Sequence, residues 1–343
     1  MIETVELAPG YRIPRIVRGG WQLAGGHGEV DRERAVRDIA AFVDSGLNTV
    51  DGADIYTGVE AIYGEFNARR RAEGQAPLQV HTKCVPDYDD LARVDAAYIR
   101  RIAERSLDRL QVRRLDLVQF HWWDYRVPGC IDAALALRDL RAEGRIAHLG
   151  GTNFDSEHTA AMLDAGVPLV SMQVQYSLLD RRPEARLVPL GQQRGVQLLC
   201  YGTLAGGFFS ERWLGAPEPT ELTNRSLIKY KLVIDDCGGW SAFQSLLQIV
   251  KSIAERHRTS IAAVATRWVL DQPGVAAAIV GARYADHLND TLAVFSLRLT
   301  DADRASLAPW LAAHPGPQGD TYALERDKTG RHGRIMKYNL NKS

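Results

Sequence analysis

Four residues whose side chains can transfer a proton follow three successive apolar stretches of the sequence. Asp51 ends the stretch NTVD, and Tyr56 comes five residues later in the turn GADIYTG. Lys83 lies in VHTKC, and His121 lies in VQFHWWDY. Any one of these residues alone could be an ordinary polar residue near the end of a strand. Together, beside three successive predicted strands, they favour one proton-transfer site.

The chemistry expected of this set is proton delivery by the tyrosine. A free tyrosine has a pKa of about 10 and is a poor acid at neutral pH. We expect the Lys83 ammonium to lower the pKa of Tyr56 by stabilising the phenolate, and Asp51 to hold Lys83 in place. We expect His121, as a neutral imidazole, to donate a hydrogen bond to a carbonyl oxygen. The reaction that fits is hydride delivery to a carbonyl carbon with proton delivery to its oxygen.

Short apolar segments alternate with segments of helical periodicity along the chain. Such strands are typical of a parallel sheet covered by helices, and eight of them favour closure into a (β/α)₈ TIM barrel. The strand segments are RIVRGGWQL, NTVDGAD, LQVHTKC, LDLVQFHWW, IAHLGGTNF, LVSMQVQYSLL, VQLLCYGTL and AAAIVGA. Catalytic residues of such barrels lie at the carboxyl ends of the strands, where Asp51, Lys83 and His121 would be neighbours.

We predict one barrel domain over residues 1–343, with a hairpin at residues 1–15 that covers the barrel bottom. A long loop, residues 205–239, follows the seventh strand. The alternative architecture is an open doubly wound sheet. That fold usually has a G-x-G-x-x-G turn after its first strand, and GGHG at residues 25–28 does not match it.

Composition excludes several classes of partner and site. Lys plus Arg equals Asp plus Glu at 42 each, so charge gives no case for nucleic acid or an anionic membrane as partner. No C-x-x-C pair and no metal-site cluster of His, Asp and Glu occurs, so we expect no metal. The scattered cysteines and an N-terminus without an apolar signal segment predict a reducing, cytoplasmic location.

These motifs together resemble the aldo-keto reductase superfamily over nearly the whole chain. The family's Asp, Tyr, Lys and His tetrad corresponds to Asp51, Tyr56, Lys83 and His121. Further similar stretches are VRGGWQL, GRIAHLGGTNF, QVQYS, CYGTLAGGFFSERW, NRSLIKY and VGARYADHLNDTL. The resemblance implies a barrel with its C-terminal tail, residues 316–343, across the mouth, and reduction of an aldehyde or ketone by NADP(H) or NAD(H).

The resemblance also implies roles for individual residues. Asn153 and Gln173 would bind the nicotinamide carboxamide, and Tyr176 would stack under the ring. Arg283 would bind the 2′-phosphate of NADP(H), with Arg225 as a further phosphate ligand. The implied coenzyme residues are Gly20, Trp21, Asp51, Thr152, Asn153, Gln173, Tyr176, Tyr201, Gly202, Thr203, Leu204, Gly206, Arg212, Arg225, Gly281, Arg283, His287 and Asp290. The implied substrate residues are Trp21, Tyr56, His121 and Trp122.

Departures from the family pattern leave coenzyme choice open. Thr152 replaces the usual Ser, Gly202-Thr203 replaces Ser-Pro, and Arg212 stands where a lysine is common. Two other functions remain as alternatives. One is an aldose or sugar dehydrogenase, because the same tetrad serves oxidation. The other is a regulatory protein like the channel β-subunits, which share the fold and the tetrad.

Overall fold

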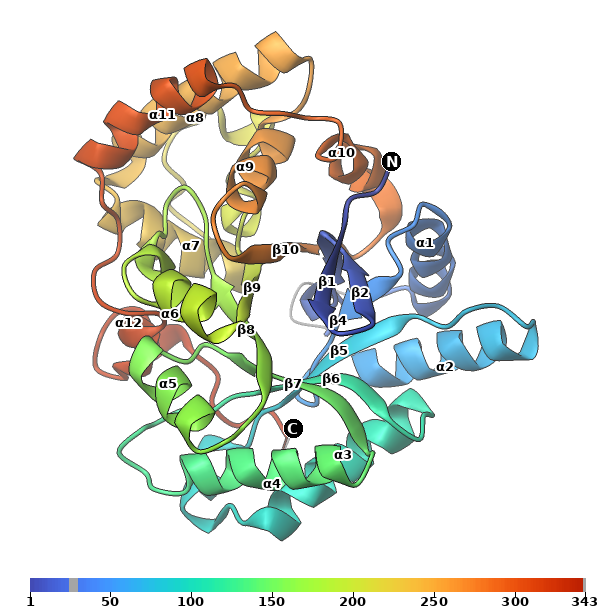
Figure 1. The fold of residues 1–343 in the computed structure, drawn as a ribbon. Helices are drawn as coiled ribbons and strands as arrows, with labels where there is room; N and C mark the ends of the chain where they lie inside the picture. The colour runs from blue at the N-terminus through green and yellow to red at the C-terminus, as the bar shows by residue number, and fades with distance from the viewer. Residues whose placement is uncertain (25–29, 342–343) are drawn as a thin grey trace.

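Eight parallel strands close into a barrel in the order β10-β3-β4-β5-β6-β7-β8-β9, which confirms the predicted (β/α)₈ fold (Figure 1). The computed structural model describes residues 1–24 and 30–341, so the segment GGHG lies outside the described residues. The barrel strands are β3 (Ile16–Gly19), β4 (Thr49–Asp51), β5 (Gln79–Cys84), β6 (Leu115–Phe120), β7 (Ile146–Thr152), β8 (Leu169–Gln175), β9 (Gln197–Tyr201) and β10 (Val275–Gly281).

The N-terminal hairpin forms as predicted, from β1 (Thr4–Ala8) and β2 (Tyr11–Pro14). Its buried residues Leu7 and Ile13 belong to one apolar cluster with Val17, Leu117 and Leu199 of the barrel strands. These five side chains form an apolar layer of the barrel interior between the hairpin and the mouth.

Side chains of a strand alternate between its two faces, so every second residue points into the barrel. In β6 the apolar inward layer begins at Leu117, and Gln119 follows it toward the mouth, with His121 next after the strand. In β9 the same step of two leads from Leu199 to Tyr201. The interior therefore has an apolar layer below the polar and aromatic mouth, and at the hairpin end Tyr11 Oη lies 3.1 Å from His81 Nε2.

Helices surround the barrel. They are α1 (Arg32–Asp44), α2 (Val59–Ala72), α3 (Ala96–Leu110), α4 (Cys130–Ala142), α5 (Ser156–Asp164), α6 (Leu187–Arg194), α7 (Arg225–Asp236), α8 (Gly239–His257), α9 (Ile261–Leu270), α10 (Leu288–Ala293), α11 (Asp301–Ala313) and α12 (Ala323–Arg326). The segment predicted as a long loop after the seventh strand contains α7, whose first turn is capped by the Asn224 side chain. The predicted long segment after the seventh strand is present, and it contains this helix because an Asn cap satisfies free amides at a helix start.

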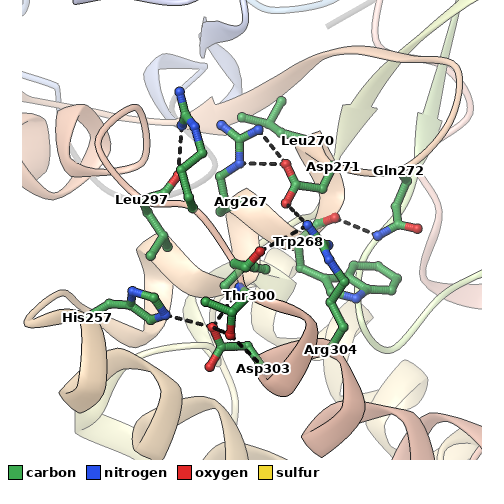
Figure 2. A network of polar contacts seen from close by, with 12 residues as sticks. His257, Arg267, Trp268, Leu270, Asp271, Gln272, Leu297, Thr300, Asp303 and Arg304 are labelled. Atoms are coloured by element: carbon green, nitrogen blue, oxygen red, sulfur yellow. Dashed lines mark hydrogen bonds and ion pairs between the residues drawn. The ribbon is translucent and has the colours of Figure 1, made fainter.

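A network of charged side chains joins α9 and α11 on the outside of the barrel (Figure 2). Asp271 accepts hydrogen bonds from Arg267 Nε at 2.7 Å and from Arg304 Nη2 at 2.9 Å. Asp303 accepts a bond of 2.7 Å from His257 Nε2. In the described part of the chain, Arg267 and Arg304 share Asp271 as carboxylate partner, so these groups stabilise helix packing.

Within residues 1–24 and 30–341, no helix is both long and apolar enough to cross a membrane.

Candidate active site

The mouth of the barrel contains a cavity of about 510 Å³. All four predicted proton-transfer residues line it: Asp51, Tyr56, Lys83 and His121. Asp51 ends β4 and Lys83 lies in β5, while His121 directly follows β6. Because β4, β5 and β6 are neighbours in the barrel, the parallel sheet itself brings these side chains together.

Asp51 is the centre of a buried hydrogen-bond network. Its Oδ2 accepts a bond of 2.7 Å from Lys83 Nζ. Its Oδ1 accepts bonds from Gln173 Nε2 at 2.6 Å and from Gln119 Nε2 at 3.1 Å. Lys83 Nζ also donates to the Gly52 carbonyl at 2.8 Å. A buried ion pair is stable only with such added hydrogen bonds, and here they fix the lysine in one position.

Tyr56 lies over this ion pair. The Lys83 ammonium is 5.0 Å from the centroid of the Tyr56 ring. The centroids of the Trp21 and Tyr56 rings also lie 5.0 Å apart. Burial raises the pKa of Tyr56 well above its ordinary value, and the negative charges of Asp51 and Asp54 raise it further. The expectation of a lowered Tyr56 pKa was wrong, because burial disfavours the phenolate and the two carboxylates repel its charge. Tyr56 is therefore held protonated.

His121 is held as a neutral imidazole. Burial lowers its pKa to about 3, and the positive charges of Arg326 and Lys83 act in the same direction. Its Nδ1 lies 2.9 Å from the carbonyl oxygen of Thr152, which can only accept, so Nδ1 carries the proton. Nε2 of this tautomer is an acceptor and has no partner among the described residues. The expected hydrogen bond from neutral His121 to a carbonyl oxygen is contradicted, and Nε2 can instead accept from a hydroxyl group.

The aromatic wall beside His121 is formed by Trp123. Its ring centroid lies 4.4 Å from that of His121, edge to face, and its Nε1 donates to the Pro86 carbonyl at 2.9 Å. Trp122 is fully buried behind the wall and donates to the Asp124 carbonyl at 3.0 Å. The prediction that Trp122 lines the substrate pocket was wrong, because neighbouring residues of an extended chain point to opposite sides.

Another tyrosine of the cavity lining, Tyr201, lies beside Asn153. Its Oη donates a 2.8 Å hydrogen bond to Oδ1 of Asn153, whose backbone is left-handed with a φ of 62°. Asn tolerates this conformation better than most residues. Tyr176, predicted to stack under the nicotinamide, is fully buried outside the cavity lining and donates to Glu184 at 2.8 Å. Tyr201, unlike Tyr176, is therefore an aromatic residue of the cavity lining.

Most of the implied coenzyme residues line this same cavity. They are Trp21, Asp51, Thr152, Asn153, Gln173, Tyr201, Gly202, Thr203, Leu204, Gly206, Arg225, Gly281 and His287. Gly20, Tyr176, Arg212, Arg283 and Asp290 are not among the lining residues.

Physical reasons are visible for three of the residues outside the lining. Gly20 is packed under the site: its amide donates to the Asp51 carbonyl at 2.8 Å, and a Cβ there would lie 2.4 Å from Tyr63 Oη. Arg212 is exposed and its guanidinium lies 5.2 Å from the centroid of the Trp213 ring. Asp290 is exposed beside His287, at 3.8 Å.

The C-terminal tail crosses the mouth as expected. Tyr322, Ile335, Met336, Lys337 and Leu340 line the cavity. Arg326 donates to the Asn153 carbonyl at 2.7 Å and to the Trp123 carbonyl at 2.9 Å. Glu325 is completely buried and accepts two bonds from Arg182, at 2.9 and 3.0 Å. The tail is therefore part of the cavity wall, and Leu340 is its last lining residue.

Three further cavity residues or supports were not predicted. Gln119 is a polar residue in the otherwise apolar inward face of β6, and that position was a signal available in the sequence. Gln22 lies against Gly281, where an added Cβ would come within 2.2 Å of the glutamine amide. Lys229 reaches the cavity from α7. No pattern within one strand or helix indicates these last two contacts.

Comparisons with known proteins agree with this geometry. The family model of the aldo/keto reductase family matches residues 15–309. Aldo-keto reductase YhdN of Bacillus subtilis is 28% identical over 87% of this chain and 90% of its own. The NADH-specific methylglyoxal reductase of Escherichia coli is 24% identical over 85% of this chain and 92% of its own. The glycerol dehydrogenase AKR11B4 structure from Gluconobacter oxydans superposes with a TM-score of 0.75, with 27% identity, covering 94% and 97% of the two chains.

Proposed function

Because the chain belongs to the aldo/keto reductase family, we propose that it is an NADP(H)-dependent oxidoreductase that reduces an aldehyde or ketone to the alcohol by direct hydride transfer. The single observation that carries this proposal is the set Asp51, Tyr56, Lys83 and His121 around one cavity. Relatives named as a methylglyoxal reductase and a glycerol dehydrogenase support a small carbonyl compound or alcohol as substrate.

In the reductive direction Tyr56 is the proton donor. Its raised pKa keeps the phenol protonated at neutral pH. An alkoxide formed from the carbonyl is a much stronger base than a phenolate, so proton transfer from Tyr56 to it is favourable. The Lys83 ammonium, fixed by Asp51 at 2.7 Å, then faces the negative charge left on the tyrosine. A positive group fixed in advance stabilises that charge without rearrangement.

The described residues fit a nicotinamide dinucleotide, which would supply the hydride. Asn153 and Gln173 present amide groups suited to a carboxamide, and Tyr201 presents an aromatic face. Arg225 lines the same cavity and is suited to a phosphate group. We favour NADP(H) over NAD(H), with Arg283 beside the lining residue Gly281 as reader of the 2′-phosphate.

One observation favours the reverse reaction, oxidation of an alcohol or sugar, as a second candidate. Nε2 of neutral His121 is an acceptor without a described partner, so it can accept a hydrogen bond from a substrate hydroxyl. Oxidation needs Tyr56 as a phenolate, and the raised pKa of Tyr56 opposes this at neutral pH. Oxidative turnover should therefore increase as pH rises toward the pKa of Tyr56, whereas reductive turnover should not require high pH.

We also propose a reducing, cytoplasmic location. The four cysteines are all free and buried in the described structure, which supports a compartment where thiols stay reduced.

The test is an assay of nicotinamide absorbance with the full chain, in both directions and with both coenzymes, against aldehydes, ketones, aldoses and polyols. The proposal expects turnover of at least one carbonyl compound with NADPH. No turnover of any carbonyl or alcohol by a protein that binds NADPH would contradict it and would favour a regulatory role.

A further inference from the structure

Lys229 is a cation in the cavity wall without a carboxylate partner. It lies in α7 and lines the same cavity as the tetrad. Among residues 1–24 and 30–341, no carboxylate oxygen lies within the 4.0 Å of an ion pair to its ammonium. Its hydrogen bond to Tyr201 Oη is long, at 3.5 Å. A half-buried ammonium whose N–H groups lack hydrogen-bond acceptors is unfavourable unless another group, such as a ligand, accepts from them.

Aromatic rings surround this ammonium. Nζ lies 4.9 Å from the ring centroid of Tyr201, 5.6 Å from that of Tyr230 and 5.8 Å from that of Tyr322. Ring faces attract a cation but accept little of its hydrogen-bonding capacity. The cage therefore holds the ammonium in place and leaves N–H groups for a ligand in the cavity.

The nearest buried acids are already engaged by another cation. Asp180 accepts bonds of 2.6 and 2.9 Å from Arg182, and Glu325 accepts two more from the same guanidinium. Two carboxylates and one arginine leave one net negative charge, which attracts Lys229 from a distance. Burial lowers the pKa of Lys229, and the charge of Glu325 opposes that shift. Arg182 acts in the same direction as burial and Asp180 in the direction of Glu325, so the cluster offsets the shift only in part while its carboxylates stay bonded to Arg182.

The cage places this charge near the tetrad. The Tyr322 ring, one of its three walls, meets the His121 ring edge to face with centroids 5.7 Å apart. Tyr201, another wall, bonds Asn153 on the coenzyme side. The ammonium therefore lies between the position of a carbonyl substrate and the position of a coenzyme.

We propose that Lys229 is an oxyanion-binding residue of this cavity, whose ammonium binds a carboxylate or phosphate group of a bound ligand. This inference rests on the proposed function. The oxyanion comes from one of two sources: an acidic group on the carbonyl substrate, or a phosphate of the coenzyme. An ammonium and an oxyanion in a site shielded by aromatic rings form a strong, charge-assisted hydrogen bond.

The test compares Lys229→Met with Lys231→Met. Lys231 lies on the same helix outside the cavity lining and pairs with Glu218 and Asp235, each at 2.6 Å. Each protein is titrated calorimetrically with NADPH and, separately, with 4-carboxybenzaldehyde and uncharged 4-methylbenzaldehyde. Lys229→Met should lose about tenfold or more in affinity for NADPH or for the carboxylate, and Lys231→Met should lose neither. Lys229→Arg should restore much of the lost affinity.

The pattern of loss identifies the source. A loss for NADPH alone assigns Lys229 to a coenzyme phosphate, and a loss for 4-carboxybenzaldehyde but not for 4-methylbenzaldehyde assigns it to the substrate. Affinities within twofold of the original chain for all three ligands would overturn the inference. Lys229→Gln repeats the test if the Met variant does not fold. Turnover is measured in parallel: a chain that reduces no carbonyl contradicts the proposed function, whereas the titrations judge Lys229 without turnover.

Discussion

The two halves of the cavity differ in how completely their polar groups are bonded before any ligand enters. In the tetrad half, from β4 to β8, Asp51 alone accepts from three side chains, and His121 is tied to the Thr152 carbonyl. In the other half, formed by β9, β10 and α7, Arg225 and Lys229 line the cavity without a carboxylate partner among the described residues.

The contrast separates groups arranged for chemistry from groups arranged for binding. A catalytic proton donor must be fixed before the transition state forms, so its neighbours are bonded in advance. A group that binds an anion keeps its donors free until the anion arrives. The network of Figure 2 supports this reading, because Arg267 and Arg304 also lie in a polar region yet are both paired with Asp271.

The largest effect is expected in the tetrad half, from Tyr56→Phe. This change keeps the ring and removes the proton, so turnover should fall by about 10²–10⁴-fold. Coenzyme affinity should stay within a small factor, because Tyr56 belongs to the bonded half. Steady-state kinetics and an NADPH titration of the same preparation measure both. Turnover close to that of the original chain would remove Tyr56 as the acid.

The next effect concerns the tail that closes the tetrad half. Glu325→Ala leaves Arg182 with Asp180 as its remaining carboxylate and should lower the free energy of unfolding by about 3 kcal/mol. Denaturant unfolding measures this change. Arg334→Ala, at an exposed position of the same tail, is the control and should change stability little. An unchanged free energy for Glu325→Ala would show that the tail is not anchored by this pair.

The Glu325–Arg182 ion pair also predicts that the folded protein loses stability in acid. Burial alone would raise the pKa of Glu325, but Arg182 outweighs it and lowers the pKa to about 2. A carboxylate with a lowered folded-state pKa contributes stability above its unfolded pKa of about 4.3, and loses it as pH falls toward the folded value. Stability should therefore decrease from about pH 4 to pH 2, and Glu325→Gln should lose that part of the dependence.

A smaller effect is expected in the open half, from Arg225→Ala. Loss of one exposed, charge-assisted contact to a phosphate should weaken NADPH about tenfold and leave turnover at saturating coenzyme unchanged. Arg212→Ala is the matched control, because Arg212 lies in the same insertion but outside the cavity lining. If both variants bind NADPH equally well, Arg225 is not a phosphate ligand.

The smallest effect is expected for Arg283→Ala. Arg283 is not among the lining residues, so its contribution to reading a 2′-phosphate should be less than about tenfold. The measured quantity is the ratio of NADPH to NADH affinities, compared with that of the original chain. An unchanged ratio would show that Arg283 does not bind the 2′-phosphate.

The tetrad half could be predicted from the sequence because strand periodicity positions it. Asp51, Lys83 and His121 follow neighbouring strands, and a parallel barrel brings such ends together. The wrong predictions in this half assigned to the cavity a residue that points to the opposite face of the chain. A step of two from His121 reaches Trp123, not Trp122, and a step of two from Gln173 reaches Gln175, not Tyr176.

The open half could not be predicted in the same way, because no barrel periodicity runs through the insertion after β9. Lys229 reaches the cavity because α7 packs on the turn that follows β9, where a Cβ at Gly202 would lie 2.3 Å from Tyr230 Oη. The neutral state of His121 was expected, but which ring nitrogen carries the proton was not readable, since it depends on the Thr152 carbonyl supplied by another strand. Both depend on contacts between segments far apart in the sequence.

Direct hydride transfer to a carbonyl carbon beside Tyr56 is the central claim. Its most direct test is to supply NADPH deuterated at C4 of the nicotinamide, in each of the two stereochemical forms, with a carbonyl compound that the enzyme reduces. The product alcohol is then examined by mass spectrometry. The account predicts that one of the two forms transfers a single deuterium to the former carbonyl carbon. Alcohol formed without deuterium from either form would contradict it.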